Sequence, residues 1–384
     1  MKHQFVIIGG GVYGCAAAWN LADAGHDVVL LEARGLASGA SGGFGRRGVR
    51  ANRRDLRELP AMRAAYRLWP ELDDRLGVPT GYRRTGGLYL IEQDTTGTRG
   101  GLLAAAAHAG VQSALGIPTE AVGRDRVFEL EPAVSPDVRG ALYCPLDGTA
   151  DHAATTRAFA EAAEKRGATL REDQEVVAVE RDGDRAVAVR TATGDRFEVG
   201  TALLVLANTG AAGLVRDAAG VELPVWPVLP QALRIAPDDG PPMTHLVGHD
   251  HRPVSLKPLT DGSVMVSGGW RGRRNPETGQ GEPTEEGVRG NLRAAAEVFP
   301  ALAGAEPLEA VANAPESCSA DEIPIVDLVP GLANAWVGTG WTAHGFALAP
   351  AVAESLTSWV TTGTRPDDLA PFALSRFGPL PRND

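Results

Sequence analysis

The first forty residues carry the feature that most constrains how this chain can fold. An apolar run at 5–8 leads into the turn Gly9-Gly10-Gly11-Val12-Tyr13-Gly14, and the spacing then predicts a helix over 12–24. A second apolar run at 28–31 ends at Glu32. Strand, glycine turn, helix, strand and acid in this order predict a βαβ unit that binds a dinucleotide.

Each part of this unit has a physical reason. Gly9 permits a sharp turn, Gly11 lets backbone approach the phosphates, and Gly14 lets the helix pack closely on the strand. The N-terminus of the helix directs free N–H groups at the pyrophosphate. The Glu32 carboxylate can accept hydrogen bonds from ribose hydroxyls. A glycine turn in an unrelated α/β protein is the alternative, and the order of the flanking elements disfavours it.

Composition narrows the class of protein. A length of 384 residues favours two interleaved domains over one simple core. The formal net charge of −11 disfavours a nucleic-acid partner. No run of 18 apolar residues occurs, so no membrane span is expected. The first strand begins too early for a signal peptide, which predicts a cytoplasmic protein. The three cysteines lack metal-ligand spacing, so we expect neither a disulfide scaffold nor a metal site.

Further segments of the sequence predict secondary structure or contacts with a ligand. A helix is expected over 53–76, and separate strands over 196–199 and 202–207. The segment at 38–45 is rich in glycine and serine, so its free N–H groups can lie against a flat or anionic ligand. Near the C-terminus, residues 340–346 read Gly-Trp-Thr-Ala-His-Gly-Phe.

Taken in this order, the motifs resemble those of the D-amino-acid-oxidase-like FAD oxidoreductases. That group includes glycine oxidase, monomeric sarcosine oxidase and the β subunits of heterotetrameric sarcosine oxidase and proline dehydrogenase. The resemblance covers nearly the whole chain and implies an α/β fold. A Rossmann-like FAD-binding domain (1–76, 145–224 and 324–384) would be interleaved with an α+β substrate domain on a mainly antiparallel sheet (77–144 and 225–323).

The resemblance also implies which residues hold FAD. Binding would be noncovalent, because Cys318 lies too close to Asp321 for the motif that carries covalent FAD in some relatives. A helix beginning near Gly345 would direct its positive end at the flavin, where reduction places negative charge. The residues expected to contact FAD are Gly9, Gly11, Val12, Tyr13, Gly14, Glu32, Ala33, Arg34, Ser41, Gly42, Gly43, Arg46, Arg47, Val177, Ala207, Asn208, Gly210, Gly340, Trp341, Thr342, His344, Gly345 and Phe346.

A second set of residues is expected to act on the substrate: Arg47, Arg50, Lys257, Met265, Trp270 and His344. Arg47 and Arg50 match an R-x-x-R pair of monomeric sarcosine oxidase, and guanidinium groups bind carboxylates bidentately. The alternative is that these arginines, with the neighbouring Arg46, Arg53, Arg54 and Arg57, form a solvated helix face.

The other candidates are single residues. Lys257 can point into the cavity from a strand and bind an acid. Met265 and Trp270 can line the substrate site, or else pack in the core. His344 suits a hydrogen-bonding spacer beside the flavin better than a base.

The implied reaction is oxidation of a C–N bond of an amine or amino acid (D-, N-alkyl or cyclic) to an imine, by hydride transfer to flavin N5. Three departures from relatives leave details open. Met265 stands where monomeric sarcosine oxidase has a lysine that helps oxygen react. Ala347 stands where it has a second lysine, and Glu316 lies near the place of an arginine in other members. The missing cations at Ala347 and Glu316 suggest, as alternatives, a bulkier amine or an acid held from a different side by Arg47, Arg50 or Lys257.

Reoxidation by O2 is expected, and the alternative is a dehydrogenase subunit that passes electrons to another acceptor. The expected partners are therefore a small amine or amino acid, O2 or another acceptor, and further subunits in a homo-oligomer or hetero-complex. Two other classes of protein are alternatives. A nicotinamide-dependent dehydrogenase would share only the opening motif, and the C-terminal motif speaks against it. A flavin-holding subunit without catalysis is compatible with the same motifs.

Overall fold

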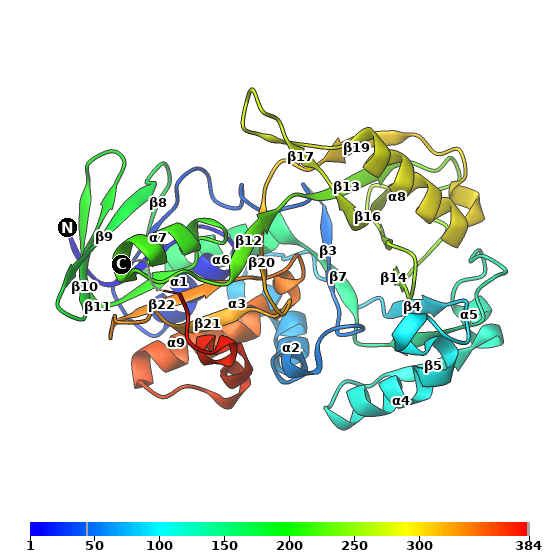
Figure 1. Ribbon diagram of the computed structural model, residues 1–384, viewed down its shortest axis with the longest axis horizontal. Coiled ribbons are helices and arrows are strands. Elements are labelled where there is room, and N and C mark those ends of the chain that lie inside the picture. The colour runs from blue at the N-terminus through cyan, green and yellow to red at the C-terminus, as the bar shows by residue number, and fades with distance from the viewer. Residues whose placement is uncertain (44, 382–384) are drawn as a thin grey trace.

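The structure is a computed structural model that describes residues 1–43 and 45–381. Two eight-stranded sheets lie at opposite ends of an elongated molecule, with short strands and loops running between them (Figure 1). Both chain termini lie beside the first sheet, so the chain leaves this sheet for the second one and returns (Figure 1).

The first sheet is mainly parallel. Its order is β21 (Ile325–Leu328), β22 (Ala335–Thr339), β11 (Arg196–Val205), β1 (Lys2–Ile8), β2 (Val28–Leu31) and β8 (Thr169–Arg171), and β9 (Val176–Asp182) and β10 (Arg185–Thr191) extend it from β11. The four central strands β22, β11, β1 and β2 pair in parallel, whereas β21 is antiparallel at the edge. Residues 5–8 of β1 are all buried, as expected where a parallel sheet is covered on both faces.

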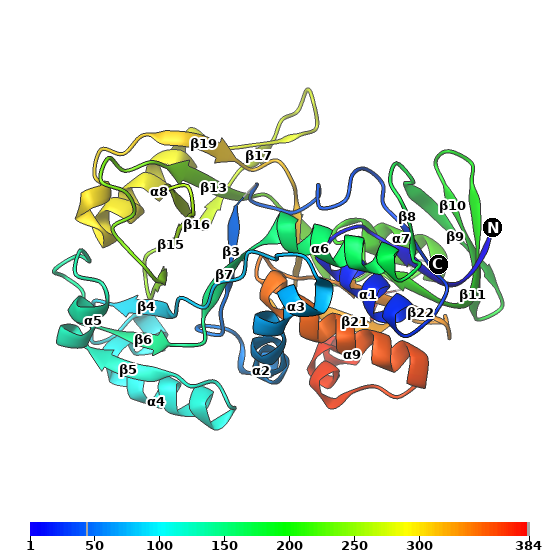
Figure 2. The ribbon, with the colours of Figure 1, turned by 180° about the vertical axis from the view of Figure 1, so that it is seen from behind.

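Helices cover the two faces of this sheet. The set is α1 (Val12–Asp23), α2 (Leu59–Leu68), α3 (Leu72–Leu76), α6 (His152–Lys165), α7 (Gly210–Ala219) and α9 (Ala349–Thr362). Helix α1 packs against α6 and α9, and Figure 2 shows these helices together. Alternate residues of β1 enter different cores: Phe5 and Ile7 face the core that contains α1, and Val6 and Ile8 face the one that contains α7.

The second sheet is antiparallel except for one pair. Its order is β19 (Pro307–Val311), β13 (Pro230–Ile235), β16 (Val264–Arg271), β15 (Ser255–Pro258), β14 (Leu246–His249), β4 (Gly87–Ile91), β6 (Gly140–Cys144) and β5 (Glu120–Gly123). Only β14 and β4 pair in parallel. Its helices are α4 (Gly101–Ala114), α5 (Arg124–Leu130) and α8 (Glu285–Val298), of which α8 packs on β16.

Short antiparallel ribbons lie between the two sheets. One pairs β3 (Arg46–Val49) with β7 (Gly148–Asp151), and the other pairs β12 (Val225–Val228) with β20 (Glu316–Ser319). A small hairpin, β17 (Arg273–Arg274) with β18 (Gly281–Glu282), projects from the second sheet (Figure 1). The α/β fold with a mainly antiparallel second sheet is confirmed, while the residue boundaries of the two domains stay a prediction.

Two local expectations were wrong. The strands expected at 196–199 and 202–207 are one strand, β11, because a bulge at residues 200–201 lets the strand bend along β1 without breaking. The helix expected over 53–76 is divided into α2 and α3, since Pro70 interrupts the helical hydrogen bonds between them. None of the described helices has both the length and the apolar character needed to cross a bilayer.

Candidate active site

A cavity of about 550 Å³ opens at the carboxyl ends of β1, β2 and β11. It is lined by segments from three distant parts of the sequence. Many of the residues expected to contact a cofactor line it: Gly9, Gly11, Val12, Tyr13, Glu32, Ala33, Arg34, Ser41, Arg47, Val177, Ala207, Asn208, Gly210, Trp341, Gly345 and Phe346. The others lie outside its lining: Gly14, Gly42, Gly43, Arg46, Gly340, Thr342 and His344.

The three motif glycines are needed for different reasons. Gly9 has a φ of +109°, and a Cβ there would lie 2.6 Å from the carbonyl oxygen of Leu206. A Cβ on Gly14 would lie 1.8 Å from the carbonyl oxygen of Gly9, so α1 depends on glycine to approach the strand. A Cβ on Gly11 would meet nothing within 4 Å. Gly11 therefore borders open space at the N-terminus of α1, which fits a cradle for phosphate.

Glu32 is fixed at the end of β2 by backbone donors. Its Oε2 accepts a hydrogen bond from the N–H of Gly10 at 2.6 Å, and its Oε1 accepts one from the N–H of Arg34 at 3.0 Å. The carboxylate is thus held against the glycine turn at the wall of the cavity. Its contact with a ribose stays a prediction.

The C-terminal motif packs directly on the opening one. The rings of Tyr13 and Trp341 stack with centroids 3.6 Å apart, and the Tyr13 hydroxyl donates to the carbonyl oxygen of Gly345 at 2.6 Å. Residues 345–348 form a 3₁₀ turn that continues into α9. These contacts join two motifs that stand more than 300 residues apart in the chain.

His344 is held by a buried ion pair that sequence reasoning missed. Its Nε2 lies 3.3 Å from Glu58 Oε2, and its carbonyl oxygen accepts a hydrogen bond from Arg54 at 2.6 Å. Arg54 and Glu58 pair at 3.0 Å with side chains 1% and 0% exposed. Burial opposes ionisation of Glu58, but Arg54 and His344 outweigh it and lower the pKa of that carboxyl. The i,i+4 spacing of the pair was the available signal.

Arg47 lies at the wall of the cavity and reaches the second sheet. Its Nη2 donates to the carbonyl oxygens of Ser41, at 2.9 Å, and Gly43, while its Nη1 lies 3.5 Å from the sulfur of Met265. Burial lowers the pKa of Arg47 to about 10, opposed by Asp151 and Glu316, so the side chain remains cationic at neutral pH.

The other substrate candidates divide into two groups. Arg47 and Arg50 both lie close enough to Lys257 to act on it electrostatically. Lys257 also stands opposite Met265 in the pairing of β15 with β16. Trp270 lies elsewhere, because its ring packs against Gly290 of α8. Its role as a wall of the substrate site stays a prediction, as do the roles of the other candidates.

The alternative of a solvated helix face is wrong for three of the arginines. Arg46 and Arg47 lie on the strand β3, and Arg54 is buried. Arg46 donates to the carbonyl oxygen of Gly81 at 2.8 Å and to Thr149 Oγ1 at 3.2 Å, so it ties β3 to its neighbours.

Glu316 is a cavity residue that the sequence marked only as a departure from relatives. It is buried, it lines the cavity, and it accepts a hydrogen bond from Ser41 Oγ at 2.7 Å. Burial raises the pKa of its carboxyl, partly opposed by Ser41, the backbone of Ala343 and Arg47. Its position depends on β20, which no local pattern revealed.

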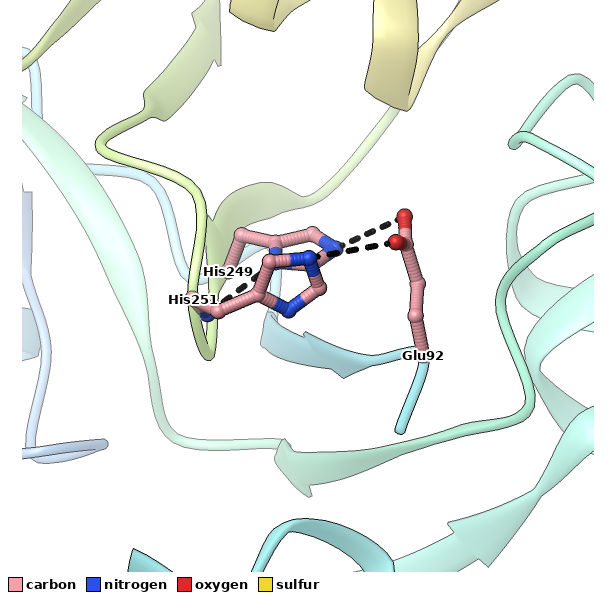
Figure 3. Close-up of side chains that lie close together, drawn as sticks. All are labelled: Glu92, His249 and His251. Atoms are coloured by element: carbon pink, nitrogen blue, oxygen red, sulfur yellow. Dashed lines mark hydrogen bonds and ion pairs between the residues drawn. The ribbon is translucent and has the colours of Figure 1, made fainter. Parts of the chain in front are cut away.

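A second polar cluster, Glu92, His249 and His251, lies where β4 and β14 of the second sheet end (Figure 3). Their possible ligand atoms all lie within 4.8 Å of one another. However, Arg252 donates to both Glu92 oxygens, at 3.1 and 2.7 Å, and His249 Nδ1 faces the N–H groups of His251 and Arg252. The proton of His249 is therefore on Nε2, which donates to Glu92 at 3.1 Å. Hydrogen bonds within the cluster account for its geometry without a metal.

Comparison with known proteins finds relatives that match nearly the whole chain. The chain is 30% identical to 4-methylaminobutanoate oxidase (formaldehyde-forming) of Paenarthrobacter nicotinovorans, over 97% of this chain but 45% of that protein, so it spans less than half of that relative. It is 25% identical to sarcosine oxidase subunit beta of an Arthrobacter species, over 98% of this chain and 91% of that one. The crystal structure of L-proline dehydrogenase from P. horikoshii superposes with a TM-score of 0.85 at 25% identity, covering 98% of both chains.

The family described as FAD dependent oxidoreductase is matched by residues 4–359. That range includes the glycine turn, Glu32 and the segment from Gly340 to Phe346, which together line or border the cavity. The chain therefore belongs to the FAD dependent oxidoreductase family, and FAD is its cofactor.

Proposed function

We propose that this protein oxidises the C–N bond of a secondary amine or amino acid to an imine. The observation that carries the proposal is the cavity in which the dinucleotide turn and the C-terminal motif meet through Tyr13 and Trp341. FAD, when bound, accepts the hydride from the substrate and returns the electrons to O2 or to another acceptor. The names of the three relatives support the substrate class, because 4-methylaminobutanoate, sarcosine and proline are all secondary amines.

The residues of the chain supply binding and orientation. The glycine turn, Glu32 and Val177 would hold the adenosine and pyrophosphate end of FAD, and Trp341 and Phe346 would border the flavin. An amine that binds in its neutral form needs no obligatory acid–base pair, because a hydride leaves carbon and the N–H proton is lost to water. The imine product then hydrolyses in solution. Orientation of the substrate and exclusion of water are the contributions expected of the protein.

The test is anaerobic reduction of the flavin. The purified protein, saturated with FAD, is mixed without oxygen with sarcosine, 4-methylaminobutanoate or proline, and absorbance near the flavin maximum is followed. At least one secondary amine should bleach the flavin, and glycine betaine, which has no N–H or lone pair, should not. Bleaching by dithionite but by none of a wider panel of N-methyl, cyclic and D-amino acids, including bulkier amines, would refute the proposal.

A second candidate is a dehydrogenase subunit of a larger complex. Similarity to sarcosine oxidase subunit beta favours it, and so does the thioether of Met265 in place of a cation near Arg47. Mixing the reduced protein with air separates the two functions. Reoxidation within a turnover supports an oxidase, whereas reoxidation much slower than bleaching supports a subunit with another acceptor. Homo-oligomerisation and a cytoplasmic location stay predictions.

A further inference from the structure

Glu316 is held where segments from different parts of the chain meet. Its strand β20 pairs with β12, and Glu316 stands opposite Val228 in that pairing. The next residue, Ser317, donates its N–H to Asn208 Oδ1 at 3.1 Å and accepts a hydrogen bond from the N–H of Thr342 at 2.9 Å. These bonds fix the backbone on both sides of β20, so the Glu316 side chain has a defined position at the cavity wall.

The carboxyl of Glu316 lies between two cavity loops, and its hydrogen-bond donors are neutral. Its Oε2 accepts a hydrogen bond from Ser41 Oγ at 2.7 Å, and the backbone N–H of Ala343 also stabilises the charged form. All three residues line the cavity, although Glu316 is only 8% exposed. A carboxylate offers about four acceptor positions. The two donors therefore leave room for a further donor that enters from the cavity.

One cation lies near this carboxyl without contacting it. Arg47 on β3 acts on Glu316 electrostatically, but its guanidinium donates to two backbone carbonyl oxygens and approaches a thioether. Within residues 1–43 and 45–381, no cation forms an ion pair with Glu316. The other titratable groups nearby are the Tyr13 hydroxyl on α1 and the Cys318 thiol on β20. Burial raises the pKa of both groups, so neither carries a charge at neutral pH.

The surroundings of Glu316 suit a cationic ligand. A buried carboxylate without a cation in contact is costly, and a cation that enters the cavity would balance its charge. Secondary amines carry a proton in neutral water, because their pKa is about 10, close to that of lysine. An ammonium group therefore brings both the positive charge and the N–H donor that the open acceptor position requires.

We propose that Glu316 binds the amine nitrogen of the substrate as its ammonium ion and then accepts one proton from it. This inference rests on the proposed function and deepens it. An N–H bond breaks, the proton joins an oxygen of Glu316, and the nitrogen keeps the electron pair. The amine is then neutral, as loss of a hydride from the neighbouring carbon requires. Burial favours this transfer, since two charged groups become two neutral ones.

Binding of the ammonium ion should depend on pH with a definite sign. Burial raises the pKa of Glu316, and above that pKa the empty carboxyl is an anion, so affinity is constant up to the pKa of the amine. Below the pKa of Glu316 the empty carboxyl holds a proton that binding must displace. The dissociation constant should then rise by up to about tenfold for each unit by which the pH falls.

The binding test uses the FAD-bound protein and a probe that cannot be oxidised. tert-Butylamine has no hydrogen on the carbon that bears nitrogen, and tert-butanol is its uncharged match. Each is titrated against the flavin absorption spectrum between about pH 5 and 8, and only tert-butylamine should perturb the spectrum. Glu316→Gln should weaken its binding by about tenfold or more and abolish the dependence on pH. Glu161→Gln, on the exposed face of α6, is the matched control and should behave as wild type.

Anaerobic flavin reduction at saturating secondary amine tests the proton transfer. Transfer inside the complex exchanges no proton with water, so the wild-type rate should be constant between about pH 7 and 9. In Glu316→Gln the proton must leave to water, and the rate should rise about tenfold for each pH unit. Glu316→Asp keeps the charge and provides a second variant if glutamine prevents folding. It should retain the pH dependence of tert-butylamine binding.

Several results would overturn the inference. They are equal binding of tert-butylamine and tert-butanol, wild-type tert-butylamine affinity in Glu316→Gln, or a reduction rate in that variant that is independent of pH. Weaker FAD binding with unchanged amine affinity in Glu316→Gln would instead assign the carboxyl to the cofactor. Bleaching of the wild type by secondary amines together with any of these results leaves the proposed function intact. Loss of tert-butylamine binding in Glu316→Gln, without bleaching of the wild type by any amine, does the reverse.

Discussion

Replacement of two neighbouring motif glycines by alanine should separate cofactor binding from folding. Gly11 has an extended backbone, with φ −80° and ψ −179°, and a Cβ there meets nothing within 4 Å. Gly11→Ala should therefore cost less than about 1 kcal/mol of the free energy of unfolding. The new methyl group would instead project where the pyrophosphate approaches the backbone.

The loss of FAD affinity can be bounded. Hydrogen bonds to a charged partner contribute about 1.5–3 kcal/mol each, so displacement from one backbone N–H should weaken binding about 10- to 150-fold. Gly14→Ala is the contrasting change. Its Cβ would lie 1.8 Å from the carbonyl oxygen of Gly9, although real Cβ atoms essentially never approach within 3.0 Å. Helix α1 must then move, at about 2 kcal/mol or more, even after the helix gains about 1 kcal/mol from alanine.

Two measurements on the same proteins test this reasoning. Urea unfolding of the FAD-free proteins gives stability, and quenching of FAD fluorescence gives affinity. Gly11→Ala should unfold like wild type and bind FAD weakly, whereas Gly14→Ala should unfold at lower urea. Wild-type FAD affinity in Gly11→Ala would show that this turn does not cradle the pyrophosphate, and wild-type stability in Gly14→Ala would show that the close packing on Gly9 is not needed.

Three further predictions concern buried ionisable side chains. Glu58→Ala should lower the free energy of unfolding by about 3–5 kcal/mol in chemical denaturation, because it leaves the buried guanidinium of Arg54 without its partner; a loss below 1 kcal/mol would contradict this. Burial lowers the pKa of His152 and His249 to about 4 from 6.5, so the unfolded chain binds more protons between these values. Stability should fall as pH drops from 6.5 to 4, by at most about 3 kcal/mol for each histidine, and an unchanged urea midpoint over that window would refute it. Glu92→Gln should lower the thermal midpoint and leave the pH dependence between 6.5 and 4 at least as steep, because the Glu92 carboxylate raises the pKa of His249 against burial. Added zinc should not raise the midpoint of the wild type.

The sequence predicted best those features that short segments determine. The turn at Gly9 and the acid at Glu32 belong to one βαβ unit, and parallel pairing of β1 with β2 and β11 brings their carboxyl ends to one edge. The mainly antiparallel character of the second sheet followed from the family resemblance rather than from periodicity. The bulge in β11 was missed because Gly200 and Thr201 look like a break between strands until the pairing with β1 is known.

The residues that surround the substrate were harder to predict, because their neighbours come from distant segments. Glu58 gains its role only when α2 lies beside His344, and Glu316 reaches the cavity only because β20 pairs with β12. Lys257 could be named as a candidate, but its hydrogen bonds to Ser255 and Ser267 depend on the register of β15 with β16. A single residue without a spacing pattern carries no such information in the sequence.

The position of Arg47 explains how the two halves of the site depend on each other. Its backbone belongs to β3, which pairs with β7 between the two sheets, and its guanidinium reaches both the cavity loop at Ser41 and the sulfur of Met265. The side chain of Arg47 therefore connects the cavity at the first sheet to the face of the second sheet that carries Met265.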